Sequence, residues 1–81
     1  MVHHNGYTFL TWNVRGLGTY VKRHRVHSYL TRQGTHVAII QETHLIGSEL
    51  DKLQRRWKGQ VFGTMYSAFA RGVLIWVRLS V

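Results

Sequence analysis

Two polar residues at the ends of predicted strands could together hold a cation. Asn13 closes the first run of strand-forming residues and Glu42 closes the second. Ligands of parallel α/β sheets collect just beyond the carboxyl ends of the strands, so these side chains converge if the strands are neighbours. A lone carboxylate beside an amide suits Mg²⁺, which usually takes one or two carboxylates plus water and phosphate oxygens. The residues alone also allow a solvated Glu42, and an Asn13 that merely closes a turn with Gly16.

The elements that would position these two residues form a strand, a helix and a second strand. Residues 7–14 alternate with period two, which predicts a strand. Residues 19–33 carry apolar side chains at helical spacing and precede Gly34, a natural helix stop. The apolar run 37–40 is typical of a strand covered on both faces. Such a βαβ unit predicts that the two strands are parallel.

The rest of the chain predicts one further helix and two further strands. Ser48 begins an S-x-x-D pattern, so we expect it to cap a helix that ends at Gly59. Residues 60–66 and 72–79 are then expected to be strands around a short loop. Residues 1–6 are polar and are predicted to be a loose start, which leaves 7–81 as a single domain.

The balance of charges narrows the function classes. The 81 residues contain 11 Lys and Arg, but only three acidic residues, for a formal net charge of +8. Paired-carboxylate sugar chemistry, an EF-hand and an all-carboxylate metal cage all need more acids than this chain can bring together. The basic surplus indicates nucleic acid as the partner, in preference to an anionic membrane.

The absence of certain residues and segments is informative as well. With no cysteine, disulfides, a disulfide-linked partner and Cys-ligated zinc are excluded. The longest apolar stretch, 73–81, is far too short to cross a bilayer and contains Arg78. No signal peptide is visible, so we expect an intracellular protein without a membrane partner.

Two ordered motifs resemble a known family of phosphodiester-cleaving enzymes. Thr11–Leu17 reads TWNVRGL and Ile39–His44 reads IIQETH, which resembles the opening of the endonuclease/exonuclease/phosphatase superfamily. The nearest likeness is to the apurinic-type endonuclease domain of LINE-type (non-LTR) retrotransposons. Lys22–Arg25 and Arg71–Ile75 are similar to the same subgroup. The resemblance extends from about Tyr7 to Leu79 and depends on the order of the motifs with a helix between them.

The resemblance implies a DNase-I-like, four-layer α/β sandwich that cleaves DNA with Mg²⁺, or with Mn²⁺ in its place. In the parent family this activity nicks target DNA in the nucleus, and the protein carries a downstream reverse transcriptase. The resemblance assigns Glu42 to the metal. It assigns Asn13 to the hydrogen-bond network that orients metal, water and phosphate. Arg15 and His44 flank this pair and could touch DNA phosphates.

The basic and aromatic residues outside the motifs have both structural and functional interpretations. Lys22, Arg23 and Arg25 could contact phosphates or could decorate a solvated helix face. His24 and His27 are spaced to share a metal, but spacing places no third ligand, which favours a solvated face. The three tryptophans fall on apolar patterns and are predicted to lie in the core: Trp12, Trp57 and Trp76.

The departures from the family pattern predict a fragment without activity. The family domain is much longer and carries a later Asp-x-Asn motif and an Asp-His pair. Neither is present here, since the only aspartate, Asp51, precedes Lys52 and no histidine follows an aspartate. We therefore expect the N-terminal portion of the sandwich, truncated after about four strands.

Two other interpretations remain open. The chain could be a small, basic, non-catalytic nucleic-acid-binding module. It could also fail to fold stably, because half a sandwich leaves an inner sheet face and an edge at Val73–Val77 uncovered.

Overall fold

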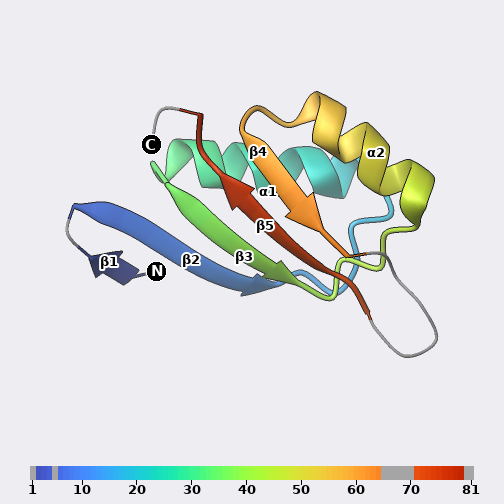
Figure 1. The fold of residues 1–81 in the computed structure, drawn as a ribbon, viewed down its shortest axis with the longest axis horizontal. Coiled ribbons are helices and arrows are strands. Elements are labelled where there is room, and N and C mark those ends of the chain that lie inside the picture. The colour runs from blue at the N-terminus through green and yellow to red at the C-terminus, as the bar shows by residue number, and fades with distance from the viewer. Residues whose placement is uncertain (1, 5, 65–70, 80–81) are drawn as a thin grey trace.

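Alternating apolar residues give the chain a sheet with one buried face, which two helices cover (Figure 1). The computed structural model describes residues 2–4, 6–64 and 71–79. The elements follow in the order β1 (Val2–His4), β2 (Tyr7–Asn13), α1 (Tyr20–Arg32), β3 (Val37–Gln41), α2 (Gly47–Arg56), β4 (Gln60–Gly63) and β5 (Val73–Val77). The chain is thus a small mixed α/β protein, as its sequence predicts.

The sheet has the strand order β1-β2-β3-β5-β4. Strands β2 and β3 are parallel, with Asn13 opposite Gln41 in the register, and all the other neighbours are antiparallel. The predicted βαβ unit is therefore confirmed, and α1 is its crossover. The carboxyl ends of these two parallel strands lie side by side at the same end of the sheet (Figure 1).

The first helix forms as its sequence predicts. The side chain of Thr19 accepts a hydrogen bond from the backbone N–H of Lys22 at 3.2 Å, which caps the amino end. Val26 and Leu30 are buried against the sheet, one helical turn apart. Glycine at position 34 has a φ of 65° and follows the last turn.

The second helix begins earlier than predicted. Its amino-terminal cap is Ile46 and its first residue is Gly47, so Ser48 lies inside the helix and is not its cap. The carboxylate of Glu49 instead accepts from the backbone N–H of Ile46 at 3.5 Å. Strand β4 ends at Gly63, sooner than expected, and most of the predicted loop lies outside the described residues.

One hydrophobic core lies between the sheet and the helices. Leu10, Ala38 and Ile40 come from the sheet, and Leu53 comes from α2. The prediction for the tryptophans is confirmed for Trp57 and Trp76, which are buried in the core. Trp12 is partly buried and packs against the core. His27 is half-buried and stacks on Trp57, with 5.1 Å between the ring centroids. The prediction that His27 lies on a solvated helix face is therefore wrong.

The opposite sheet face remains open among the described residues. Phe9, Ile39 and Ile75 each keep 39% of their surface exposed there, and Phe62 keeps 57%. The prediction that the 37–40 strand is covered on both faces is therefore wrong for this part of the chain, because both helices pack on the same side.

The positions of the sheet edges also differ from the prediction. Strand β5 lies between β3 and β4, so Val73–Val77 is not an edge. The edges are β1 and β4. Residues 2–4, which are predicted to be a loose start, form β1 and pair with β2.

A glycine allows the start of β5 to approach the end of β3. Gly72 has a φ of 87°, and a Cβ built there would lie 2.5 Å from Thr43 Oγ1.

We expect Gly72→Ala to lower the free energy of unfolding by about 1–3 kcal/mol, since it adds both backbone strain and a steric clash. Urea titration followed by circular dichroism measures this. Gly18→Ala is the matched control, because nothing lies within 4 Å of its Cβ position; equal stability of the two variants would contradict the argument.

Candidate functional site

The backbone joins the carboxyl ends of the two parallel strands into a rigid frame. Their pairing does not stop with the regular strands but continues into the following residues. Three bonds extend it: Val14 N–H to the Gln41 carbonyl at 3.1 Å, Gly16 N–H to that of Glu42 at 2.6 Å, and Leu17 N–H to that of Thr43 at 2.8 Å. Residues 14–17 and 41–43 are therefore fixed relative to each other by the main chain.

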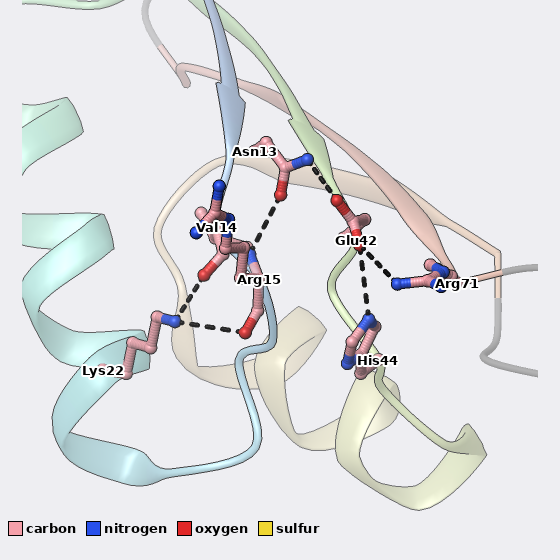
Figure 2. Close-up of polar contacts among 7 residues, drawn as sticks. All are labelled: Asn13, Val14, Arg15, Lys22, Glu42, His44 and Arg71. Atoms are coloured by element: carbon pink, nitrogen blue, oxygen red, sulfur yellow. Dashed lines mark hydrogen bonds and ion pairs between the residues drawn. The ribbon is translucent and has the colours of Figure 1, made fainter.

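Asn13 and Glu42 meet on this frame. The Asn13 side-chain amide, through Nδ2, donates a hydrogen bond to Glu42 Oε2 (Figure 2). Asn13 Oδ1 accepts from the backbone N–H of Arg15 at 3.1 Å, which fixes the orientation of the amide. The two residues singled out from the sequence thus lie together, as parallel neighbouring strands require.

The other oxygen of the Glu42 carboxylate faces two basic groups (Figure 2). Arg71 Nη1 donates to Oε1 at 3.0 Å, and His44 Nε2 lies 3.9 Å from the same oxygen. The Arg71 side chain is 70% exposed and that of Glu42 is 26% exposed. An ion pair this exposed to solvent contributes little to stability, so the Arg71 side chain can leave Glu42 at little cost.

Arg71 belongs to the site, although its local sequence does not identify it as a site residue. It stands only two residues before β5, and its backbone carbonyl accepts from the His44 N–H at 2.8 Å. Its place in the site follows from the antiparallel pairing of β5 with β3. No local sequence pattern predicts that pairing. The one sequence feature that points to Arg71 is the similarity of the Arg71–Ile75 stretch to the endonuclease subgroup.

Three non-glycine residues of this region adopt left-handed backbone angles. Arg15 has a φ of 53°, Glu42 of 54° and His44 of 55°. Such conformations cost about 1–3 kcal/mol each and persist only where the surrounding structure enforces them. Their concentration around one carboxylate marks the strand ends as a constrained site.

The predicted phosphate-binding cations lie in different surroundings. Lys22 Nζ donates to the backbone carbonyl of Val14, and lies 3.4 Å from that of Arg15 (Figure 2). Arg23 Nη1 donates to the Leu17 carbonyl at 3.0 Å. Both side chains therefore hold the loop after β2 in place.

The remaining predicted phosphate contacts are not joined into one site. Arg15 and Arg25 are exposed, and Arg25 lies in the middle of α1. Of the five predicted contacts, His44 is the one whose side chain faces Glu42.

The surroundings of Glu42 keep its carboxylate ionised. The hydrogen bond from Asn13 is the largest cause that holds the pKa of Glu42 below its usual value, followed by the hydrogen bond from Arg71. The charges of Arg71 and His44 act in the same direction, and partial desolvation opposes them. Glu42 is therefore an anion at neutral pH, as a metal ligand must be.

The donor set fits a single Mg²⁺ ion in a limited way. Among the described residues there is no group of three or more His, Cys, Asp or Glu that could hold a metal. Glu42 supplies one carboxylate, which is the minimum that Mg²⁺ uses, and water and phosphate oxygens would have to supply the rest. Arg71 would first have to release Oε1.

Comparison with known proteins adds no assignment: a scan against protein-family models found none that matches this chain. Within the described part of the chain, neither helix has the length and apolar character that a membrane span needs.

The stabilisation from Glu42 should depend on pH in a defined direction. A carboxyl whose pKa is lowered on folding stabilises the protein above its unfolded-state pKa, about 4.5, and this stabilisation is lost as the pH falls. We therefore expect the wild type to be more stable than Glu42→Gln near pH 7, and the difference to vanish at low pH.

Urea titrations of both proteins from pH 7 to pH 3 measure this difference. Repeating them at high salt is the control, because an exposed charge pair is screened there and the difference should shrink. A difference that is the same at every pH would show that the charge of Glu42 does not matter.

Proposed function

We propose that this chain is the N-terminal part of a DNase-I-like endonuclease domain of the endonuclease/exonuclease/phosphatase superfamily, and that its partner is DNA. The observation that carries the proposal is the hydrogen bond between Asn13 and Glu42 at the ends of adjacent parallel strands. The two residues belong to the two motifs that resemble the LINE-type retrotransposon subgroup. A parent protein with a downstream reverse transcriptase, acting in the nucleus, belongs to the same proposal.

The open sheet face agrees with this proposal. A four-layer sandwich buries one face of each sheet under helices and the other against a second sheet. In the part of the chain that the structure describes, helices cover one face of the sheet only, and the other face is lined with apolar side chains, among them Phe9, Ile39 and Ile75. An apolar face of this kind needs a cover, and the second sheet of a sandwich would supply it.

Each residue of the site has a role in this proposal. Glu42 would hold Mg²⁺, or Mn²⁺ in its place, and the bound ion would polarise a phosphate oxygen or activate a water molecule. Asn13 fixes the orientation of the Glu42 carboxylate through its amide. Arg71 and His44 lie where they can take a DNA phosphate oxygen in exchange for Glu42 Oε1.

The chain brings a single carboxylate to this site and lacks the later Asp-x-Asn and Asp-His motifs of the family. Glu42 is one of three acids, and the other two, Glu49 and Asp51, lie in α2. No second carboxylate is therefore available to position an attacking water or to protonate the leaving oxygen. The proposal includes that this chain alone does not hydrolyse DNA.

A plasmid-nicking assay tests this statement. The purified chain with supercoiled plasmid and Mg²⁺ should produce no more open circles than buffer does, because the later catalytic motifs of the family are absent from its sequence. Glu42→Ala is the control for contaminating nucleases, since a contaminant nicks equally in both preparations. Turnover by the wild type that disappears in Glu42→Ala would overturn the statement.

A second function is favoured by the two donors on Glu42. Its carboxylate already accepts from Asn13 and Arg71, and the chain carries a net charge of +8. These features also suit a small basic module that binds nucleic acid without metal and without catalysis. In that case Glu42 only holds the strand ends together.

The dependence of DNA affinity on Mg²⁺ separates the two functions. At constant ionic strength, we expect Mg²⁺ to tighten binding of a DNA duplex by the wild type, because the ion links Glu42 to phosphate. Glu42→Gln, which keeps the size of the side chain, should lose this response. Fluorescence anisotropy measures both. Binding that weakens with salt but ignores both Mg²⁺ and the substitution would favour the non-catalytic module.

A further inference from the structure

A cavity of about 290 Å³ opens between α1 and α2, on the side of the sheet that the helices cover. The side chains that line it come only from the two helices and from Trp57, which directly follows α2. None of Asn13, Glu42, His44 and Arg71 lines the cavity, so it is a separate place from the strand-end site. Its size is near the lower end of small-molecule sites, about 300–1,000 Å³.

The cavity concentrates positive charge. Arg23 reaches it from α1, and Lys52 and Arg56 reach it from α2; no lining residue is acidic. Lys52 and Arg56 are four residues apart on one helical face, an arrangement in which like charges repel. Among the residues that the structure describes, no carboxylate lies within 4.0 Å of any of these cations. An anion in the cavity would relieve this repulsion.

Flat rings form the other part of the lining. Tyr20 is 61% exposed, and its ring stacks with that of His24 at 6.1 Å and an interplanar angle of 13°. Deeper in, His27 stacks on Trp57 at an angle of 20°. Burial lowers the pKa of His27, and the charges of His24 and Lys58 add to this, while a hydrogen bond to the Lys58 backbone opposes it. The inner ring is therefore neutral near pH 7.

We propose that this cavity binds one unstacked nucleotide, with the phosphate on Lys52 and Arg56 and the base against the Tyr20 and His24 rings. Cations supply charge-assisted hydrogen bonds to phosphate, and aromatic faces stack on any base. The volume admits one nucleotide unit and excludes a base-paired duplex. The nucleotide comes either from a single strand or from a free mononucleotide. The proposal does not depend on the endonuclease function, because it uses no residue of the strand-end site.

Titration of the chain with AMP, monitored by calorimetry, tests the phosphate contacts. Replacing both Lys52 and Arg56 with Gln should weaken AMP binding about tenfold or more, the loss expected when charged hydrogen bonds are removed. The control replaces Arg25 on α1 and Arg55 on α2 with Gln, which removes the same charge. Both of these residues are exposed, and neither lines the cavity. The proposal is overturned if AMP does not bind, or if both double variants lose affinity equally.

A second pair of variants tests the stacking of the base. Tyr20→Ala should weaken AMP binding about five- to 100-fold and leave the weaker binding of inorganic phosphate unchanged, whereas Tyr20→Phe should bind AMP as the wild type does. Tyr20 is exposed, so neither variant should disturb the fold, and thermal melts verify this. AMP that binds no better than inorganic phosphate would overturn the assignment of the base.

Competition with a short oligothymidylate identifies the source of the nucleotide. If the oligonucleotide displaces AMP at a lower concentration than AMP itself requires, the ligand is a single strand; if it does not displace AMP, the ligand is a free nucleotide. Glu42→Gln should bind AMP as the wild type does. Failure of the strand-end function therefore leaves this proposal intact, and failure of AMP binding leaves that function intact.

Discussion

The parallel pairing of β2 with β3 is the constraint on which the rest of the structure depends. Parallel strands cannot be joined by a tight turn, so the chain between them must cross over one face of the sheet, and here it does so as α1. That crossover buries Val26 and Leu30 against the strands and makes this face the core side. The same pairing brings the carboxyl ends of both strands to one place, where Asn13 and Glu42 meet.

The left-handed residues at the strand ends are a consequence of this frame. Glu42 and His44 sit on a segment whose main-chain groups are bonded on both sides, to the loop after β2 and to the start of β5. Because these bonds fix the backbone, the strain of two unfavourable φ angles is tolerated. The carboxylate of Glu42 is then held by the backbone, by Asn13 and by Arg71, and no single contact has to position it.

The parts of this arrangement that the sequence predicts are those governed by local periodicity. The alternation in residues 7–14 and the helical spacing in 19–33 are local, and from them the parallel pairing and the meeting of Asn13 with Glu42 follow. Arg71 could not be placed, because β5 inserts between β3 and β4 through contacts distant in the sequence. The sequence pattern misplaces the start of α2, because Ser48 satisfies a capping pattern that the structure does not use.

The cavity between the helices was also beyond sequence reasoning, and the physical reason is similar. The residues that line the cavity depend on the distance between α1 and α2. The sizes of the buried side chains beneath the helices determine this distance, and no sequence motif encodes it. The cluster at 22–25 shows the difficulty well. Nearby positions on one helix have different surroundings. Lys22 and Arg23 donate hydrogen bonds to backbone carbonyls, and Arg23 also lines the cavity, whereas Arg25 is exposed to solvent. A run of basic residues predicts an affinity for phosphate, but only the packing of the second helix determines which of them can act together.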